Sequence, residues 1–276
     1  MEDINSNKIQ LRVCILNWNG GEDLQRCIDS LFRNSNQDFK ITVIDNNSTD
    51  NSLKHIRPDI DIVRFNKNHG YSKGYNLGIE KSAKDDEYII LLNFDTIVAP
   101  DFISSLLKEI KIKGKDYIYG VKILYGNNKN LIWYAGGKID LPKGIICHIG
   151  LRENSQKYSL MRKTDYVTGC CLIVHKQNYQ KLNGFDTQFF MYNEDVDFCL
   201  RAKNIGLECL YLPSSVIYHN VSTSTGGNYS MKKMLLKTKS SYLLFRKYYS
   251  LPISLFLLLI YFNRTLFGIN QIKKQN

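Results

Sequence analysis

The sequence predicts an α/β fold in which a mostly parallel sheet is flanked by helices and followed by a C-terminal helical tail. Through the first hundred residues, short runs rich in β-branched residues alternate with amphipathic stretches. This alternation is typical of parallel sheets whose strands are joined by helices. The chain changes character after Glu208, because residues 209–276 hold nine lysines and arginines and no acidic residue. We therefore expect one folded domain over residues 1–228 and a basic, apolar tail over residues 229–276.

Four apolar runs in the first hundred residues are predicted strands, and each ends at or next to a polar residue. They are Leu11–Asn17, Lys40–Asp45, Ile62–Phe65 and Tyr88–Asn93. A helix is predicted between the first two, because the stretch from Glu22 to Phe32 is amphipathic. Ligands of open α/β sheets bind beyond the carboxyl ends of the strands. The candidate binding residues by position alone are therefore Asn17, Asp45, Asn66, and Asn93 to Asp95.

The polar segment Asp45–Asp50 directly follows the second predicted strand. Its carboxylate and amide groups can hydrogen-bond the edge of a nucleobase or the hydroxyls of a ribose. This chemistry makes Asp45 and Asn47 candidate ligand contacts. Serine, threonine, aspartate and asparagine also favour the position that begins a helix. We expect both roles, with Asp45 facing a ligand and Ser48–Asp50 beginning a helix.

Three glycines stand four residues apart at Gly70, Gly74 and Gly78, within the segment Asn68–Gly78 that also contains Asn76. On a helix these glycines share one face. Such a face permits close approach to a neighbouring strand or to a diphosphate at the helix start. Packing is the stronger interpretation for Gly74 and Gly78. The spacing is not that of the G-x-G-x-x-G motif, which argues against a nicotinamide-dependent dehydrogenase.

The segment Asn93-Phe94-Asp95 closes the most apolar predicted strand. An acid at such a strand end offers a hard oxygen ligand to Mg²⁺ or Mn²⁺. The alternative is a simple turn before a helix that begins near Pro100. His219 follows another strand-like run, and a lone histidine is more often structural than a metal ligand.

The second half of the domain is predicted to contain more strand and loop than helix. Residues 117–160 are irregular and rich in glycine, which indicates turns. A buried strand is predicted over Tyr166–Val174, followed by a helix near Asn178. A second helix is predicted from Asn193 through Ala202.

Glu194, Asp195 and Asp197 crowd the start of this last helix, where the helix dipole favours negative charge. Asp197 lies one turn before Arg201, so a surface ion pair accounts for it. That explanation fits the two adjacent acids less well, because they directly follow the aromatic, glycine-containing segment 184–192. We expect Glu194 and Asp195 to form the floor of a pocket that holds a general base.

The net charge of +11 is concentrated in the tail. Residues 1–208 carry 28 basic and 26 acidic residues, or +2, and residues 209–276 carry the other +9. The apolar run of the tail, Leu251–Phe262, is shorter than the about 20 residues that a membrane-spanning helix needs. We expect the tail to attach to an anionic membrane surface, with docking on the domain as the alternative. Nucleic acid is not an expected partner, because basic and aromatic residues do not interleave on the domain.

The cysteines and the N-terminus favour a cytoplasmic protein. Seven cysteines include no C-x-x-C pair, and most of them lie in apolar runs. Buried thiols in a reducing cytosol are therefore expected, without disulfides or a zinc site. Residues 1–5 are acidic and polar and provide neither the basic nor the apolar region of a secretory signal. With the basic tail, these features predict a cytoplasmic protein that is peripheral on the inner face of the cell membrane.

Taken together, the motifs resemble the family-2 inverting glycosyltransferases with the GT-A fold, and within them the bacterial rhamnosyltransferase-like branch. The resemblance runs in order from about Val13 to His219. Its parts are residues 15–19, 43–50, 68–78, 91–95, 168–172 and 184–201, the last being the most specific. The D-x-D metal motif of the family has Asn93 in its first position here, so Asp95 carries the metal assignment.

The resemblance implies a metal-dependent enzyme that uses Mn²⁺ or Mg²⁺ and a nucleoside-diphosphate sugar donor. Asp95 and His219 would bind the metal. Asp195 would be the catalytic base, and Glu194 would orient the acceptor or support the base. Asp45 would contact the nucleoside. Further donor contacts would come from Asn17, Asn47, Asn68, Gly70, Gly74, Asn76 and Asn93.

The same resemblance divides the domain into a nucleotide-binding half over about residues 1–116 and an acceptor half over about residues 117–228. The basic, partly apolar tail suits an acceptor glycan or a saccharide carried on a lipid diphosphate. Such acceptors are used in the assembly of cell-surface polysaccharide.

Two other functions stay open at this point. A sugar nucleotidylyltransferase shares a related α/β domain, but it should carry a glycine-rich loop with cations after the first strand. Asn17–Gly21 contains no cation. A non-catalytic, membrane-associated protein that binds nucleotide sugars is the second alternative, and the presence of Asp95, Asp195 and His219 argues against it.

Overall fold

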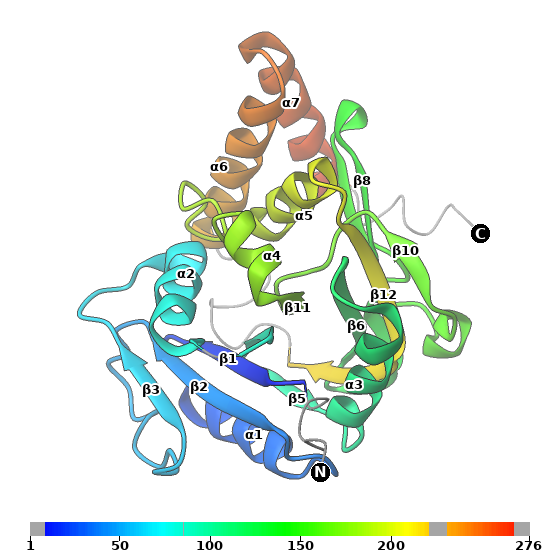
Figure 1. The fold of residues 1–276 in the computed structure, drawn as a ribbon. Helices are drawn as coiled ribbons and strands as arrows, with labels where there is room; N and C mark the ends of the chain where they lie inside the picture. The colour runs from blue at the N-terminus through cyan, green and yellow to red at the C-terminus, as the bar shows by residue number, and fades with distance from the viewer. Residues whose placement is uncertain (1–8, 85, 221–230, 268–276) are drawn as a thin grey trace.

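A ten-stranded sheet with the order β10-β12-β6-β11-β4-β1-β2-β3 forms the centre of the computed structural model, which describes residues 9–84, 86–220 and 231–267 (Figure 1). Two further strands of this sheet lie off that path, because β5 pairs with β12 and β7 pairs with β6. The strands are β1 (Leu11–Asn17), β2 (Phe39–Asp45), β3 (Asp61–Arg64), β4 (Tyr88–Asn93), β5 (Thr96–Val98), β6 (Tyr117–Tyr125), β7 (Asn128–Tyr134), β10 (Arg162–Thr164), β11 (Cys171–His175) and β12 (Glu208–His219).

The direction of the strands divides the sheet. Strands β3, β2, β1 and β4 are all parallel to one another, as the first hundred residues predict. Strand β11 is antiparallel to both of its neighbours, β4 and β6, and it joins this parallel half to a mixed half. The predicted α/β fold is confirmed, with parallel pairing concentrated in the N-terminal half.

Helices cover both faces of the sheet. The helices are α1 (Gly21–Phe32), α2 (Gly70–Ser82), α3 (Phe102–Lys113), α4 (Lys176–Lys181), α5 (Glu194–Asn204), α6 (Met231–Tyr248) and α7 (Leu251–Phe267). Short 3-10 helices η1 (Leu141–Lys143) and η2 (Ser155–Tyr158) and a two-stranded sheet of β8 (Gly137–Asp140) and β9 (Ile145–His148) complete the described elements. Helices α1 and α3 pack on one face, and α2, α4 and α5 pack on the other (Figure 1).

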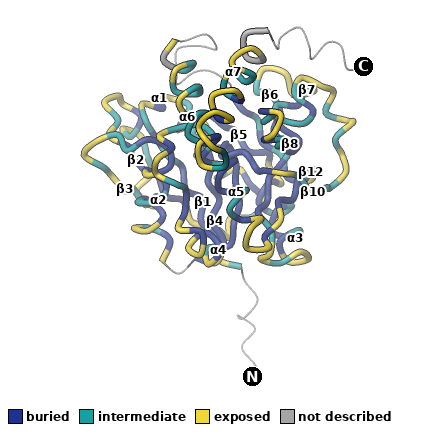
Figure 2. Tube along the Cα trace, turned by 90° about the horizontal axis from the view of Figure 1, so that it is seen from above, coloured by how far each residue is buried: buried dark blue, intermediate teal, exposed yellow. Residues whose placement is uncertain are grey.

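Strand β1 shows how the sequence dictates these two layers. Successive side chains of a strand point to opposite faces, so alternate residues share a core. Leu11, Val13 and Ile15 belong to the core beneath α1 and α3, whereas Cys14 belongs to the core beneath α2 and α5. The central strands are buried on both sides, and exposed residues lie mostly at the periphery (Figure 2).

The carboxyl ends of the parallel strands meet at one edge of the sheet. In the strand register, Asn17 lies opposite Asp45, and Leu16 lies opposite Asn93. Asp45 in turn lies opposite Arg64 on β3. The predicted clustering of polar strand ends is confirmed, and this edge holds the candidate site.

The helix expected to begin at Ser48–Asp50 is not formed. Turns occupy residues 51–55, and no helix is present between β2 and β3. The Asp50 side chain accepts hydrogen bonds from the amide of Ser52 at 3.1 Å and from that of Gly21 at 2.8 Å. The capping residues therefore stabilise a turn, and Pro58 follows too soon for a long helix to develop.

The tail forms a helical pair, α6 and α7, that docks on the domain beside α5 (Figure 1). Leu244 and Phe245 of α6 and Leu257 of α7 are buried in the same core as α5. The expected boundary at residue 228 lies outside the described residues, as do residues 1–5. Among the described helices, none combines the length and the apolar character that crossing a membrane requires.

Six of the seven cysteines are buried, as expected, and Cys147 is exposed. The six buried cysteines are free thiols. The expectation of buried thiols therefore holds for all but one of them.

Candidate active site

An open pocket of about 440 Å³ lies beyond the carboxyl ends of β2 and β3. Its lining residues are Asp45, Ser48, Asp50, Asn51, Leu53, Lys54, Arg64 and Phe65. The volume falls within the range of small-molecule sites. A carboxylate and an aromatic ring in one pocket suit a nucleoside, since the carboxylate accepts hydrogen bonds and the ring stacks on a base. Asn47 is exposed beside this pocket and has a left-handed backbone, with φ of 65°.

Asn17 positions the loop that forms this pocket. Its side chain is fully buried, and its amide nitrogen donates hydrogen bonds to Asp45 at 3.2 Å, Ser48 at 2.9 Å and Ser52 at 2.9 Å. Its amide oxygen accepts from the backbone of Gly20 at 3.2 Å. Asn17 therefore orients Asp45 through a hydrogen bond made inside the protein. Because its side chain is fully buried, the expectation that Asn17 itself touches the donor is corrected.

The start of α2 is occupied by the protein's own groups. The amide of Gly70 donates to the side chain of Asn68 at 2.8 Å, and the amide of Tyr71 donates to the carbonyl of Phe190 at 2.7 Å. Gly70 has a φ of +77°, and a Cβ there would lie 2.5 Å from the Phe190 carbonyl oxygen. Asn46 fixes the same turn by donating to Asn68 and to the Gly70 carbonyl. The amides of Gly70 and Tyr71 are therefore engaged within the protein, and donor contacts at Asn68 and Gly70 stay a prediction.

The remaining glycines of α2 serve packing. A Cβ at Gly74 would lie 2.9 Å from Leu16, and a Cβ at Gly78 would lie 2.3 Å from Ile44. Both distances are shorter than a normal carbon contact, so only glycine lets α2 approach β1 and β2 this closely. Packing is the correct interpretation for both, and Gly74 is removed from the expected donor contacts.

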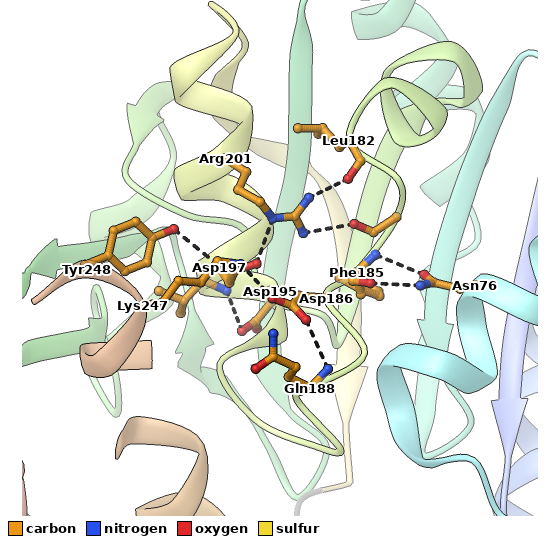
Figure 3. Close-up of polar contacts among 12 residues, drawn as sticks. Asn76, Leu182, Phe185, Asp186, Gln188, Asp195, Asp197, Arg201, Lys247 and Tyr248 are labelled. Carbon is orange, nitrogen blue, oxygen red and sulfur yellow. Dashed lines mark hydrogen bonds and ion pairs between the residues drawn. The ribbon is translucent and has the colours of Figure 1, made fainter. Parts of the chain in front are cut away.

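Asn76 ties α2 to the loop that precedes α5 (Figure 3). Its oxygen accepts hydrogen bonds from the Tyr179 hydroxyl at 2.6 Å and from the Phe185 amide at 2.9 Å. Its nitrogen donates to the Phe185 carbonyl at 2.8 Å. Asn76 therefore braces this loop, and its role as a donor contact stays a prediction.

Asp95 and His219 lie together, as the predicted metal site requires. The Nε2 atom of His219 is 3.3 Å from Oδ1 of Asp95, and each residue is 7% exposed. Antiparallel pairing of β5 with β12 sets this proximity, because His219 lies opposite Thr96 in the register. The backbone of Asn220 also donates to the Asp95 carbonyl at 2.9 Å.

The chemistry of this pair fits a divalent cation. Oδ1 of Asp95 and Nδ1 of His219 are buried, and neither has a hydrogen-bond partner among the described residues. A carboxylate oxygen and an imidazole nitrogen suit Mn²⁺ or Mg²⁺. The described residues include no cluster of three or more His, Cys, Asp or Glu side chains that could hold a metal alone. Asn93 is half-buried at the end of β4, two residues before Asp95.

Asp195 lies at the first turn of α5 and is held by a backbone strap, which we define as residues 168–170. Its Oδ2 accepts a hydrogen bond from the Gly169 amide at 2.8 Å, and its Oδ1 accepts from the Val196 amide at 2.8 Å. The next strap residue, Cys170, accepts a hydrogen bond from the Asn93 amide at 3.0 Å. The strap therefore connects Asp195 to the end of β4, two residues before Asp95. The sequence gives no sign of this connection, because both contacts use backbone groups.

Glu194 and Asp195 form a coupled pair of carboxyl groups. Glu194 is 5% exposed, and its Oε2 has no hydrogen-bond partner among the described residues. Burial, together with the neighbouring Asp195 charge, raises the pKa of Glu194 well above its usual value. Burial also raises the pKa of Asp195, but the amides of Gly169 and Val196 oppose that rise. The proton is therefore held more readily by Glu194, and Asp195 is the carboxylate better suited to act as a base.

Asp197 has a different role from the surface pair predicted for it. Its side chain is 0% exposed, and it forms ion pairs with Arg201 at 2.7 Å and with Lys247 of α6 at 2.7 Å (Figure 3). Tyr248 also donates to it, at 3.2 Å. The pairing with Arg201 follows from helical spacing, as predicted. The surface location was wrong, because α6 covers this side of α5 and buries Asp197 at the junction.

The comparison with protein families agrees with this geometry. The model described as "Glycosyl transferase family 2" matches residues 12–182, which is more than half of the chain. The chain belongs to this family. A second model, described as "N-terminal domain of galactosyltransferase", matches residues 150–233 of this glycosyltransferase. Both matches include the strap, and only the second reaches the Glu194-Asp195 pair.

Relatives of this glycosyltransferase include rhamnosyltransferases. It is 29% identical to rhamnosyltransferase WbbL of Escherichia coli over 208 residues, which is 70% of this chain and 78% of the relative. It is 24% identical over 238 residues to N-acetylglucosaminyl-diphospho-decaprenol L-rhamnosyltransferase of Mycobacterium tuberculosis, covering 78% of each chain. The resemblance to the rhamnosyltransferase-like branch is therefore confirmed.

Solved structures share the fold of this glycosyltransferase. GalNAc-T7 with UDP, GalNAc and Mn²⁺ matches with a TM-score of 0.69 at 17% identity, over 87% of this chain and 48% of the neighbour. The chain thus spans about half the length of that neighbour. Mannosyltransferase PcManGT from Pyrobaculum calidifontis, with GDP-Man and Mn²⁺, matches with a TM-score of 0.62 at 12% identity, over 92% of this chain and 69% of the neighbour. These likenesses confirm the GT-A fold.

Proposed function

We propose that this glycosyltransferase moves a sugar from a nucleoside-diphosphate donor to a hydroxyl of a glycan or lipid-linked acceptor, with inversion at the anomeric carbon. The observation that carries the proposal is the strap, because it holds Asp195 and contacts the strand end that leads to Asp95. A candidate base and a candidate metal site are thereby joined by adjacent residues. Inversion follows from a single in-line displacement, in which the acceptor oxygen attacks as the diphosphate leaves.

In this mechanism the described residues bind, orient and move a proton. The pocket at Asp45 and Phe65 holds the nucleoside of the donor. Asp195 removes the proton from the acceptor hydroxyl, and the Gly169 amide keeps its carboxylate aimed through the 2.8 Å hydrogen bond. Glu194, which keeps its own proton more readily, supports Asp195 or orients the acceptor.

Asp95 and His219 are the residues that would hold Mn²⁺ or Mg²⁺, with the remaining ligands coming from the donor diphosphate and water. A bound divalent ion neutralises negative charge that develops on a leaving diphosphate. The neighbours with bound Mn²⁺ support this assignment.

The acceptor is proposed to be a saccharide on a lipid diphosphate, in the synthesis of cell-surface polysaccharide. The printed name of the Mycobacterium relative contains such a lipid diphosphate. The family match argues against the nucleotidylyltransferase alternative. The alternative that remains is a non-catalytic protein that binds nucleotide sugars, and an assay of sugar transfer distinguishes it from the enzyme.

Transfer is tested by supplying UDP-, dTDP- and GDP-sugars with Mn²⁺ and a lipid-diphosphate saccharide. We expect one donor class to raise the melting temperature, because a ligand at 100 times its Kd stabilises the native state by about 2.7 kcal/mol. The same donor should release its nucleoside diphosphate and extend the acceptor. A donor that stabilises the protein and is never consumed with any acceptor would indicate the non-catalytic alternative.

We infer that the outer face of α7 binds an anionic membrane, so that the enzyme is peripheral on the inner face of the cell membrane. This apolar face consists of Leu251, Ile253, Leu255, Phe256, Leu259 and Phe262, all of which are exposed. The opposite side of α7 is buried against the domain through Ser254 and Leu257. The outward face therefore carries apolar side chains where a docked helix would normally be polar. Lys143 lies on η1, which contacts α7, and its side chain is exposed.

Vesicle binding tests the membrane proposal. The protein should sediment with phosphatidylglycerol vesicles at low salt and less with phosphatidylcholine vesicles. Leu259→Ser together with Phe256→Ser should weaken binding at least about tenfold, since each large apolar side chain contributes about 1.5–3 kcal/mol when buried. The matched control is Ile112→Ser on α3, because Ile112 and Leu259 are each 65% exposed. Equal binding by the α7 double variant and the control would overturn the proposal.

A further inference from the structure

Helix α6 places two lysines on the face that it buries against the domain. Residues at positions 233, 237, 240, 241 and 244 recur at helical spacing and share one face. Ser240, Ser241 and Leu244 of this face are buried, whereas Lys233 and Lys237 are half-buried at its N-terminal end. At this end of the face, lysines stand where apolar residues would be expected. Half-buried ammonium groups lose hydration, so a negatively charged ligand or partner would stabilise them.

Hydrogen bonds fix this helix on the segment that leads to the catalytic pair. The Ser240 hydroxyl donates to the carbonyl of Met191 at 3.0 Å and also contacts the carbonyl of Tyr192. The side chain of Asn193 donates to the Ser241 hydroxyl at 3.1 Å. The contacts anchor α6 to the three residues that precede Glu194. These contacts fix the face of α6 that carries Lys233 and Lys237 relative to the residues that precede Glu194.

Lys237 lies against the wall of the site. Its ammonium nitrogen is 5.3 Å from the centre of the Tyr192 ring, two residues before Glu194. Burial lowers the pKa of Lys237, and the nearby charge of Lys233 lowers it further. Burial lowers the pKa of His148 to about 4, with smaller contributions from His219 and Lys237. The ring of Trp133 connects these histidines, at 4.5 Å from His148 and 4.4 Å from His219.

Lys233 lies within electrostatic reach of the candidate metal ligand. Burial lowers its pKa, and the charge of Asp95 opposes that shift. Yet within residues 9–84, 86–220 and 231–267, neither Lys233 nor Lys237 forms an ion pair with a carboxylate. Two half-buried ammonium groups that share one small region repel each other and lose hydration. A ligand that carries two or more negative charges would relieve both costs.

We propose that Lys233 and Lys237 bind the diphosphate of the donor, so that α6 forms part of the donor site above Asp95 and His219. The inference rests on the proposed function, since it takes the nucleoside-diphosphate donor from there. It assigns the tail a second role besides membrane attachment. The expected ligand chemistry is a diphosphate held by two ammonium groups, which bind phosphate as point charges.

Binding of nucleoside diphosphates to Lys→Met variants tests this role. Wild-type protein with Mn²⁺ would be titrated with UDP, dTDP and GDP, and with uridine, thymidine and guanosine. Lys233→Met and Lys237→Met should each weaken binding of the preferred diphosphate about 10- to 100-fold, the size of a lost charge-assisted hydrogen bond. Binding of the matching nucleoside, which has no phosphate, should not change. Lys237→Arg should retain part of the affinity.

Lys239→Met is the matched control, because Lys239 is exposed on the same helix. Its diphosphate affinity should equal that of the wild type. None of the three lysine-to-methionine variants should lower the melting temperature of the ligand-free protein. Lys237→Met should not lower it because the change removes a half-buried charge. If wild-type protein binds a diphosphate and the Lys233 and Lys237 variants bind it equally well, this inference is wrong and the proposed function stands. If wild-type protein binds none of the three diphosphates, the proposed function itself fails.

Discussion

Asp195→Asn is expected to lower the rate of sugar transfer by about 10²–10⁴-fold, the usual contribution of a general base. Asparagine keeps the size of the side chain, and its one oxygen can still accept the hydrogen bond from Gly169, although the bond from Val196 is lost. It cannot take a proton from the acceptor. We expect the fold to be preserved because the side chain keeps its size, and the melting temperature of the variant checks this. Turnover is measured as release of the nucleoside diphosphate in the presence of acceptor.

The pH dependence provides a second readout for Asp195. Burial raises the pKa of its carboxyl group, and only the ionised carboxylate is a base. Activity should therefore fall as the pH falls through this raised pKa, at a higher pH than an ordinary aspartate would give. The residual activity of Asp195→Asn should lack this acidic limb. An acidic limb that is identical in both proteins would assign the titration to another group.

Asp197 is a poor neutral control for this experiment, although helical spacing alone suggests it. Asp197→Asn removes the charge that binds both Arg201 and Lys247, and it should lower the melting temperature by loosening α6 from α5. Asp59→Asn is the better control, since Asp59 pairs with Arg57 at an exposed position. It should leave both turnover and stability near the wild-type values.

Asp95→Ala is expected to abolish metal-dependent binding of the donor. Loss of the carboxylate removes one of the two protein ligands proposed for the ion, leaving His219 alone. Charge stabilisation by a divalent ion contributes several kcal/mol, so turnover should fall by at least about 100-fold. EDTA should have the same effect on the wild type, and Mn²⁺ or Mg²⁺ should restore its activity.

The matched control for Asp95→Ala is Asp101→Ala. Asp101 is exposed just before α3, and its side chain makes no capping hydrogen bond. Its metal-dependent donor binding should remain intact. Normal turnover by EDTA-treated wild type, or unchanged metal-dependent binding by Asp95→Ala, would overturn the metal assignment.

The strand ends of the parallel half could be predicted because their chemistry is local. Each apolar run specifies a buried strand, and the polar residue that follows it is placed at the carboxyl edge by the topology alone. Asp45 and Asn93 therefore lie where the sequence predicts. Pairing of β5 with β12 is long-range, so the proximity of Asp95 and His219 rested on family resemblance and not on spacing.

The roles of several amides could not be predicted from the sequence. An asparagine side chain offers the same donor and acceptor to a ligand or to a backbone group. The Asn17 side chain donates hydrogen bonds to Asp45 and to two serines. The Asn76 side chain bonds the backbone of Phe185, which lies 109 positions later in the chain. The strap at Gly169 was missed for a related reason, because its contact with Asp195 uses a backbone amide that carries no sequence signal.

Burial by the tail was the other feature that local patterns could not reveal. The spacing of Asp197 and Arg201 correctly indicates an ion pair on one helix face. Lys247 reaches the same carboxylate from α6, and only the packing of α6 shows that this face is covered. The same packing half-buries Lys233 and Lys237 of α6.

Equilibrium donor binding measured beside turnover for Asp195→Asn is the most direct test that this chain transfers sugar with Asp195 as the base. We expect the variant to bind the metal–donor complex with an affinity close to that of the wild type, while its turnover falls about 10²–10⁴-fold. Such a split places the defect in the chemical step. Full turnover by a correctly folded Asp195→Asn protein would contradict the assignment of the base and, with it, the proposed mechanism.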